Sequence, residues 1–321
     1  MGSDARPLSC WVVTDGKAGM ESQCVGLAEA LGFTPIVKRV RLRSPWRQLT
    51  PYFRIGGRAQ FASSSDALNP PWPELLIATG RHSVAASLLV KKLSSGRTKT
   101  VQLQNPVIAP RHFDLVAVPR HDRLEGANVV STRGALHRVT PELLRHGAEQ
   151  LAPKVAYLAR PYIGVLIGGT NAVYRLGSAE MTALARHLAA AARGMKGSLL
   201  VTPSRRTGEE NLRILEAGLS DVPHDIWDGQ GENPYFGILG LADFLVVTCD
   251  SVNMVSEAAS TGKPVYVFDL PGFSEKFARF HHALREGGVT RPFTGSLAHY
   301  AYAPLDDVSV VAARVRTLLR P

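Results

Sequence analysis

The sequence predicts an α/β protein with two Rossmann-like domains, each built on a doubly wound parallel sheet, that face each other across a cleft. Short apolar runs rich in β-branched residues alternate with helical patterns along the chain. The alternation restarts after a proline-bearing segment at 152–161, and 321 residues is about twice the usual length of one domain. We therefore expect a first domain over 1–152, a second over 153–303, and a terminal helix over 304–321 that can cross back to the first.

The first half opens with a buried strand at 10–14, which leads through the loop Asp15-Gly16-Lys17-Ala18-Gly19 into a helix at about 21–31. A strand, a glycine-bearing loop and a helix are typical of the first unit of a doubly wound domain, whose loop lies at the ligand-facing edge. The loop matches neither the Walker pattern nor the pattern G-x-G-x-x-G. The further elements expected here are strands at 36–40, 74–79, 98–104, 114–118 and 129–132 and helices at 83–93 and 140–151, the last with Thr140 as N-cap and Pro141 at its first position.

The second half repeats the alternation. Its expected strands lie at 163–167, 198–202, 224–227, 244–248 and 265–268, and its helices at 178–193, 209–217, 234–241, 252–261, 275–286 and 306–319. Parallel strands end on one edge of their sheet, so the loops after them should converge. These loops carry Gly168, Gly169, Thr170, Ser204, Arg205, Arg206, Asn233, Tyr235, Asp250 and Ser251.

The convergent loops have the chemistry of a nucleotide-diphosphate site. The pair Gly168-Gly169 lets backbone N–H groups approach an anion, and Arg205 or Arg206 can grip phosphate oxygens with two hydrogen bonds. No metal-ligand motif and no serine-hydrolase elbow accompany them, so we expect neither a metal nor that chemistry.

The helix that starts after the strand at 244–248 adds a second feature. Asp250 and Ser251 are N-cap residues, and the N–H groups and positive dipole end at 250–253 suit a phosphate. Glu257 lies one turn beyond Asn253 on the same face, where a carboxylate can accept hydrogen bonds from a ribose diol. In the alternative interpretation, Asp250 and Ser251 only cap a helix and Glu257 faces solvent.

Composition indicates an ordinary globular protein with a basic surface. The net charge is +10, but no basic run is interleaved with aromatic residues as in nucleic-acid-binding modules, so we expect no nucleic acid partner. A denser basic segment at 38–58 suits an anionic membrane surface or an acidic lipid-linked acceptor, or is simply solvated. It contains Lys38, Arg39, Arg41, Arg43, Arg47, Arg54 and Arg58 with Trp46, Tyr52 and Phe53.

Targeting features and cysteine usage indicate the compartment. The sequence has no long apolar run and no secretory signal pattern, and its 3 cysteines have neither metal nor redox spacing. We expect a cytoplasmic protein that can lie at the inner face of the membrane.

The motifs together resemble one family over nearly the whole chain. They are TDGKAG at 14–19 with Gln23, TGR at 79–81, HFDL at 112–115, PRHDRL at 119–124, GALHRVTPE at 134–142, LIGG at 166–169, TPSRRT at 202–207, NPYFG at 233–237 and TCDSVNMVSEAASTGKPVYVF at 248–268. The chain is identified as similar to the bacterial glycosyltransferase-like family related to the plant mitochondrial-fission protein "elongated mitochondria".

The resemblance implies a GT-B-like fold and a metal-independent enzyme that binds a nucleotide sugar, as co-substrate rather than cofactor, mainly in the second domain. It implies that Gly168, Gly169, Ser204 and Arg205 face the pyrophosphate, that Ser251 caps the phosphate-binding helix and that Glu257 holds ribose. The acceptor side would be formed by the first-domain residues of the loop and its neighbours, namely Gly16, Lys17, Gly19, Gln23 and Arg81.

The mechanism implied is direct displacement at the anomeric carbon, with a base that deprotonates the acceptor hydroxyl. Some relatives carry His directly after the GKAG motif, where this sequence has Met20. Asp15 is our first candidate for the base and His82 the second. The leading hypothesis is an inverting transfer to a cell-envelope or lipid-linked acceptor, and the alternatives are a nucleotide-sugar epimerase or hydrolase and a non-catalytic membrane-associated scaffold with a vestigial nucleotide site.

Overall fold

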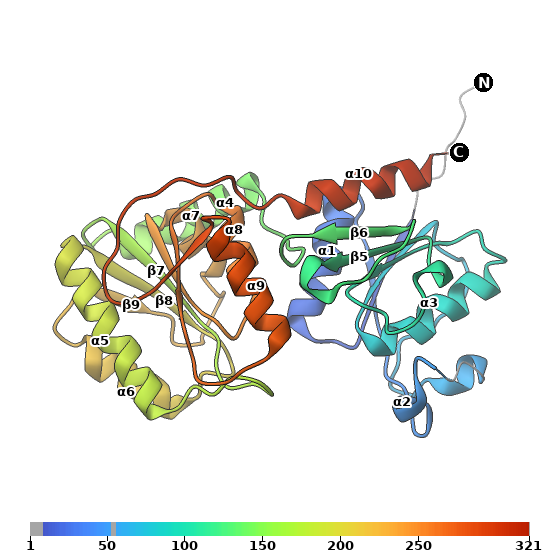
Figure 1. Ribbon diagram of the computed structural model, residues 1–321, viewed down its shortest axis with the longest axis horizontal. Helices are drawn as coiled ribbons and strands as arrows, with labels where there is room; N and C mark the ends of the chain where they lie inside the picture. Colours follow the sequence, from blue (N-terminus) through green and yellow to red (C-terminus); the bar gives the residue numbers. More distant parts are fainter. Residues whose placement is uncertain (1–8, 53–55, 321) are drawn as a thin grey trace. The chain divides into compact units, whose positions relative to one another are not determined.

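The computed structural model describes residues 9–52 and 56–320, and Figure 1 shows its ribbon. The chain divides into two compact units. Unit 1 comprises the described residues up to Arg138 together with those from Asp306 onward, and unit 2 comprises Val139–Leu305. Each unit contains one six-stranded sheet in which all described pairings are parallel, which confirms the predicted fold class.

The sheet of unit 1 has the strand order β2-β1-β3-β4-β5-β6. Its strands are β1 (Cys10–Thr14), β2 (Ile36–Arg39), β3 (Leu75–Thr79), β4 (Lys99–Leu103), β5 (Leu115–Pro119) and β6 (Val129–Thr132). Helices α1 (Ala18–Ala30) and α10 (Asp307–Leu319) contribute to the core on one face, and α3 (Arg81–Leu93) to the core on the other. The short helix α2 (Trp46–Leu49) and a 3-10 turn at Gly57–Gln60 lie between β2 and β3.

Strand order places the candidate residues of unit 1 together. The chain runs from β1 outward to β2 and returns to β3 on the other side of β1. In a doubly wound sheet, the crevice forms at such a reversal, beyond the carboxyl ends of the two strands. The loop after β1 begins with Asp15, and the turn after β3 holds Gly80, which introduces α3.

The sheet of unit 2 has the order β12-β11-β10-β7-β8-β9, and the reversal lies between β7 and β10. Its strands are β7 (Tyr162–Ile167), β8 (Ser198–Pro203), β9 (His224–Ile226), β10 (Phe244–Thr248), β11 (Val265–Phe268) and β12 (Thr290–Pro292). Its helices are α4 (Pro141–Leu151), α5 (Ser178–Met195), α6 (Glu209–Leu219), α7 (Tyr235–Leu241), α8 (Val252–Ser260) and α9 (Glu275–Glu286).

The division between the units falls at 138/139 rather than at 152/153, because α4 packs on α7 within unit 2. The two helices meet backbone to backbone: a Cβ on Gly147 would lie 2.7 Å from the backbone nitrogen of Gly237. At the other end of the chain, Val311 and Val315 of α10 are buried in the core shared with α1, so α10 belongs to unit 1.

Candidate functional site

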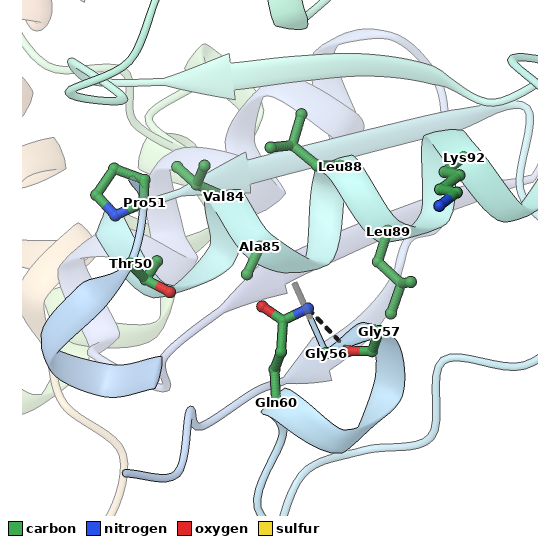
Figure 2. Close-up of a pocket in the computed structure, with 10 residues that line it drawn as sticks. All are labelled: Thr50, Pro51, Gly56, Gly57, Gln60, Val84, Ala85, Leu88, Leu89 and Lys92. Atoms are coloured by element: carbon green, nitrogen blue, oxygen red, sulfur yellow. Dashed lines mark hydrogen bonds between the residues drawn. The ribbon is translucent and has the colours of Figure 1, made fainter. Parts of the chain in front are cut away.

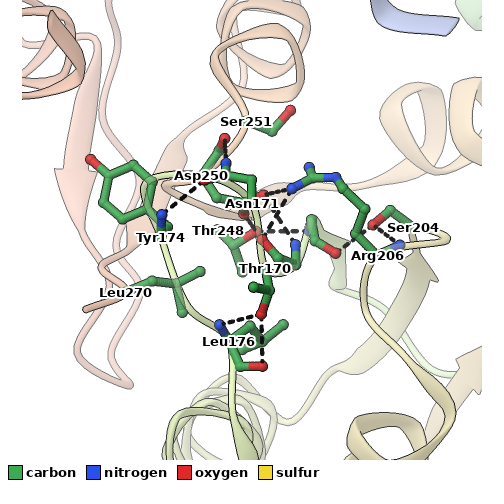
Figure 3. Close-up of polar contacts among 12 residues, drawn as sticks. Thr170, Asn171, Tyr174, Leu176, Ser204, Arg206, Thr248, Asp250, Ser251 and Leu270 are labelled. Carbon is green, nitrogen blue, oxygen red and sulfur yellow. Dashed lines mark hydrogen bonds and ion pairs between the residues drawn. The ribbon is translucent and has the colours of Figure 1, made fainter. Parts of the chain in front are cut away.

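The loops at the crevice of unit 2 form one hydrogen-bonded network centred on Asp250 (Figure 3). The carboxylate of Asp250 is fully buried and forms an ion pair of 2.8 Å with Nη1 of Arg206. It also accepts hydrogen bonds from Oγ1 of Thr248 at 2.6 Å and from the backbone nitrogen of Gly169 at 3.0 Å. The loops after β7, β8 and β10 are therefore held together by this one carboxylate.

Asp250 is not an N-cap, contrary to our expectation, because its side chain points into this network. Ser251 alone caps α8, and its Oγ accepts a hydrogen bond of 3.3 Å from the backbone nitrogen of Met254. Asp and Ser are both favoured as N-cap residues, so the local sequence does not distinguish Asp250 from Ser251. The ion pair with Arg206 holds the Asp250 side chain away from the helix start and leaves Ser251 as the cap.

The two glycines allow the loops to approach one another. A Cβ on Gly168 would overlap the Asp250 carboxylate, and a Cβ on Gly169, whose φ is +153°, would overlap the backbone carbonyl of Arg206. Both N–H groups are used inside the protein, since that of Gly168 donates to Oγ1 of Thr248 at 2.8 Å and that of Gly169 to Asp250. The glycine pair thus allows the loops after β7, β8 and β10 to pack closely.

The two neighbouring arginines differ sharply in environment. Nη1 of Arg206 also donates to the backbone carbonyl of Gly169 at 3.0 Å, so this guanidinium is held in the network. Arg205 is exposed and has no ion-pair or hydrogen-bond partner among the described residues. Ser204 is also committed internally, because its Oγ donates to the backbone carbonyl of Gly168. Arg205 is the cation of this loop that is available to an incoming anion.

Thr170 and Asn171 shape the loop after β7 (Figure 3). Oγ1 of Thr170 accepts from the backbone nitrogen of Leu176 at 3.0 Å, and Nδ2 of Asn171 donates to the backbone carbonyl of Asp250 at 3.1 Å. The side chain of Thr170 thus closes its own loop, and Asn171 joins that loop to the start of α8.

Glu257 is buried, which excludes the interpretation that it faces solvent. The residue is only 8% exposed to solvent. Its Oε2 accepts a hydrogen bond of 2.5 Å from the hydroxyl of Tyr235. Burial raises the pKa of the Glu257 carboxyl to about 7, and the hydrogen bond from Tyr235 partly offsets this rise. Burial and the nearby carboxylate raise the pKa of the Tyr235 hydroxyl well above its ordinary value.

Asn233 connects this pair to β8. Its Oδ1 accepts from Oγ1 of Thr202 at 3.1 Å and from the backbone nitrogen of Tyr235 at 3.0 Å. Asn233 therefore fixes the start of α7 at the end of β8, with Tyr235 directed at Glu257. Asn253 lies half-buried in the first turn of α8, one turn before Glu257.

In unit 1, Asp15 lies at the carboxyl end of β1 and is bound to its own loop. Its Oδ2 forms an ion pair of 2.8 Å with Nζ of Lys17, and its Oδ1 accepts from the backbone nitrogen of Lys17 at 3.3 Å. The backbone nitrogen of Gly16 donates to Oγ1 of Thr14 at 3.1 Å. The loop is a closed turn with a carboxylate that one cation already neutralises.

His82 lies in the first turn of α3, within electrostatic reach of Asp15. Partial burial lowers the pKa of the His82 imidazole; the Asp15 carboxylate opposes this shift, and Lys17, Arg47 and Arg81 add to it. His82 is therefore neutral at pH 7 and carries a free lone pair. The lowered pKa keeps the imidazole in the neutral form, which is the form that can accept a proton.

The other predicted acceptor-side residues have structural contacts. Arg81 donates from Nε to the backbone carbonyl of Thr50 and from Nη2 to that of Gln48 at 2.9 Å, so it anchors the α2 segment. Gln23 is buried, and its Oε1 accepts from Nε2 of Gln104 at 3.3 Å. Gly19 lies in the first turn of α1. Of these residues, the structure brings Gly16, Lys17 and Arg81 to the crevice edge of the sheet.

Met20 lies beside the turn that introduces α3. Its Sδ is 3.1 Å from the position that a Cβ would take on Gly80. The side chain at position 20 thus lies beside Gly80, two residues before His82. A histidine at position 20 would lie beside the same turn.

The basic segment of unit 1 is partly paired. Arg39 forms a two-pronged ion pair with Glu21 at 2.8 and 2.9 Å, and Arg43 lies over the Trp46 ring, 5.5 Å from its centroid. Arg41 and Arg47 are exposed. Lys38 lies over the Trp11 ring, Arg58 donates to the backbone carbonyl of Leu68, Tyr52 is exposed, and Phe53 and Arg54 lie outside the described residues.

The described part of the chain contains neither a metal-binding cluster nor a helix suited to span a membrane. No group of three or more His, Cys, Asp or Glu side chains there is arranged to hold a metal ion. Within 9–52 and 56–320, no helix combines the length and the apolar character needed to cross a bilayer.

Sequence reasoning missed Thr248 and Thr207 as parts of the network. Oγ1 of Thr207 donates to the backbone carbonyl of Gly168 at 2.7 Å and accepts from the backbone nitrogen of Ser204 at 3.0 Å. A signal existed in the spacing Ser204-x-x-Thr207 and Thr248-x-Asp250, which places short polar side chains directly after two buried strands.

Comparison with solved structures places the fold. The S. aureus MnaA structure with UDP has a TM-score of 0.53 and 13% identity, over 98% of this chain and 88% of that one. UDP-GlcNAc 2-epimerase from Neisseria meningitidis, bound to UDP-GlcNAc, has a TM-score of 0.50 and 13% identity, over 98% of this chain and 100% of that one. At these identities the likeness concerns the fold alone, which is GT-B-like.

Comparison of sequences gives the family. The mitochondrial fission protein ELM1 of Arabidopsis thaliana is 31% identical over 386 residues, covering 95% of this chain and 90% of that protein. The profile of the family described as mitochondrial fission ELM1 matches residues 18–319. The chain therefore belongs to the mitochondrial fission ELM1 family, as its motifs predicted.

Proposed function

We propose that this protein is a metal-independent inverting glycosyltransferase that takes its sugar from a nucleoside-diphosphate sugar held by unit 2. The observation that carries the proposal is the pair of features on α8 at the crevice between β7 and β10. The helix begins directly after Asp250, whose carboxylate pairs with Arg206 and so holds the loop that also carries the exposed Arg205, and six residues beyond Ser251 it carries the buried carboxylate of Glu257. This arrangement suits a ligand with a diphosphate at one end and a ribose diol at the other.

Each residue then has one role in binding the donor. The start of α8 and Arg205 hold the diphosphate, because the helix dipole and a guanidinium both favour negative charge. Glu257 accepts hydrogen bonds from the ribose hydroxyls, and Tyr235 fixes the carboxylate in position for them. The network of Asp250 and Arg206 keeps the loops in place and does not touch the ligand. The names of two fold relatives, one with UDP and one with UDP-GlcNAc, support a nucleotide sugar as the ligand class.

The chemistry is a single displacement. The acceptor hydroxyl attacks the anomeric carbon as the bond to the diphosphate breaks, and its proton passes to a general base. We assign the base to His82, which is neutral at pH 7, with the Asp15 carboxylate stabilising the imidazolium that forms. The charge that develops on the leaving diphosphate is stabilised by Arg205 and the start of α8.

We propose a cell-envelope or lipid-linked saccharide as the acceptor, reached from the cytoplasmic side at the inner face of the membrane. The exposed Arg41 and Arg47 of the basic segment support this, because cations near an anionic leaflet attract a protein to it.

A product assay tests the proposal and separates the alternatives. The protein is incubated with UDP-, GDP-, ADP-, CMP- and dTDP-sugars, with and without bacterial membrane lipid extract, and products are followed by NMR. We expect nucleotide release that depends on the extract, with inverted configuration at the anomeric carbon. Arg205→Ala should lower this rate, whereas the exposed control Arg213→Ala should not. Free sugar without extract would indicate a hydrolase, and a changed sugar on the intact nucleotide would indicate an epimerase. Binding without any turnover would support a scaffold.

A further inference from the structure

Unit 1 contains a cavity that the proposed reaction does not use (Figure 2). Its volume is about 400 Å³, and it lies between α3 and the segment that holds α2 and the 3-10 turn. A cavity of this size, with mostly apolar walls and a few polar atoms, is typical of small-molecule sites. It is lined by Thr50, Pro51, Gly56, Gly57, Gln60, Val84, Ala85, Leu88, Leu89 and Lys92.

The cavity is an elongated slot along one face of α3. Val84, Ala85, Leu88 and Leu89 recur at the spacing of one helical face. From Val84 to Lys92 the helix rises about 12 Å, because each residue adds about 1.5 Å. The wall between the two ends is aliphatic, so the slot favours a linear hydrocarbon chain.

One end of the slot carries two buried polar atoms without a partner. Thr50 is 1% exposed and Gln60 is 4% exposed, and neither Oγ1 of Thr50 nor Oε1 of Gln60 has a hydrogen-bond partner among the described residues. Figure 2 shows both atoms directed into the space below Ala85, while Nε2 of Gln60 donates to the carbonyl of Gly57 at 2.9 Å. Buried polar atoms left unpaired are costly, and a hydroxyl can satisfy both by accepting from Thr50 and donating to Gln60.

The other end of the slot carries a cation. Lys92 lies at the last turn of α3, is exposed, and has no ion-pair partner in the part of the chain that the structure describes. Its neighbour Lys91, by contrast, is paired with Asp114 at 2.9 Å. Lys92 is therefore available to an anionic group at the mouth of the slot.

We propose that this slot binds a linear aliphatic molecule with a hydroxyl at one end and a carboxylate at the other, in the class of the hydroxylated medium-chain carboxylic acids. The hydroxyl lies between Thr50 and Gln60, the chain lies against Ala85 and Leu88, and the carboxylate meets Lys92. The site belongs to unit 1 alone, and it does not depend on nucleotide binding by unit 2.

Calorimetric titration with three probes tests the assignment: 10-hydroxydecanoate, decanoate, which lacks the hydroxyl, and 1-decanol, which lacks the carboxylate. We expect saturable binding of 10-hydroxydecanoate with one site per chain. Decanoate should bind about 3- to 10-fold more weakly, because it leaves Thr50 and Gln60 unpaired. Equal affinity for the two acids, or no saturable heat with any probe, would overturn the proposal.

Variants assign each contact. Thr50→Val keeps the shape and removes the hydroxyl, so it should abolish the preference for 10-hydroxydecanoate over decanoate without lowering the melting temperature. Lys92→Gln should weaken both acids about 3-fold and leave 1-decanol unchanged, whereas Lys196→Gln, an exposed lysine of unit 2, should change none.

A steric pair completes the test. Ala85→Phe fills the slot and should abolish binding of all three probes, whereas Leu93→Phe, on the exposed end of α3, should not. Both variants are compared by melting temperature. Retained binding in Ala85→Phe would place the ligand elsewhere and contradict the proposal, and if this variant does not fold, the Thr50→Val comparison decides alone.

Discussion

The hydroxyl of Tyr235 donates a hydrogen bond of 2.5 Å to Oε2 of the buried Glu257. This bond joins the first turn of α7 to the middle of α8, and it leaves the other carboxylate oxygen for a further donor. Burial raises the pKa of Glu257 to about 7, so near neutral pH the carboxyl is divided between its two protonation states. The proposed ribose contact is therefore also a group whose charge affects stability.

Glu257 should make stability fall as pH rises. Its pKa is about 7 in the folded protein, against 4.5 for an ordinary glutamate. Between these pH values, the folded state keeps a proton that the unfolded state has released, so the free energy of unfolding decreases with increasing pH. Glu257→Gln cannot ionise and should remove this decrease, which we expect to be about 2–3 kcal/mol.

Urea unfolding of both proteins from pH 4.5 to 8 measures this effect. The difference between the two curves isolates Glu257, because other groups act in both proteins. One of these is His137, whose pKa burial lowers to about 4 and which acts in the opposite direction, losing stability as pH falls below its ordinary value of 6.5. A difference that does not vary with pH would contradict the raised pKa.

Arg205 and Arg206 should respond differently to the same substitution. Arg206→Ala leaves the Asp250 carboxylate buried without its cation, so we expect a loss of about 2 kcal/mol, reduced from fully buried pairs because Arg206 is 40% exposed. Arg205→Ala should change stability by less than about 0.5 kcal/mol. It should instead weaken nucleoside-diphosphate binding about 10-fold and leave nucleoside binding unchanged.

Urea unfolding measures the stability of Arg205→Ala and Arg206→Ala, and calorimetric titration measures their binding of nucleoside diphosphate. If Arg205→Ala destabilises the protein as much as Arg206→Ala does, or binds diphosphate normally, then Arg205 has no role in holding the ligand.

His82 should set the acid limb of the pH–rate profile. Because burial lowers the pKa of His82, kcat/KM should begin to fall only below the ordinary histidine pKa of about 6.5. Asp15→Asn removes a group that raises this pKa, so the limb should move to still lower pH. His82→Asn should lower kcat by about 10²-fold or more and abolish the limb. An unchanged limb in His82→Asn would assign the base to another group.

The basic segment should support binding to anionic membranes. Replacing both Arg41 and Arg47 by Gln should weaken binding to phosphatidylglycerol vesicles about 10-fold at low salt, since each cation near such a surface contributes about 1 kcal/mol. Cosedimentation measures this, and Arg186→Gln with Arg213→Gln in unit 2 makes the same change of charge. Equal losses in the two double variants would indicate general charge attraction rather than this segment.

The architecture was predictable because most strands of the two sheets, such as β1, β3, β7 and β10, are buried on both faces. β1, β10 and β11 begin and end at the residues that their sequence patterns indicate, and Thr140 caps α4 as the local pattern indicates. No comparable pattern indicates β12, a three-residue edge strand of Thr, Arg and Pro, or the four-residue helix α2.

The location of the site could be predicted from the sequence, but most of its side-chain contacts could not. Strand order brings the convergent loops together, but Asp250 takes its role from Gly169 and Arg206, which lie 81 and 44 positions away in the sequence. The burial of Glu257 likewise depends on Tyr235, 22 positions earlier. Pairings over such separations, like the backbone contact of α4 with α7, leave no trace in local composition.

The most direct test of the donor site is calorimetric titration of the wild-type protein and Glu257→Gln with UDP-, GDP-, ADP-, CMP- and dTDP-sugars and the corresponding nucleotides. We expect saturable, one-site binding of nucleotides of one base class. In Glu257→Gln this binding should be weaker by about 1.5–3 kcal/mol, for loss of a charged hydrogen bond. Absence of binding by every nucleotide, or equal affinity of the two proteins, would contradict a donor site on α8.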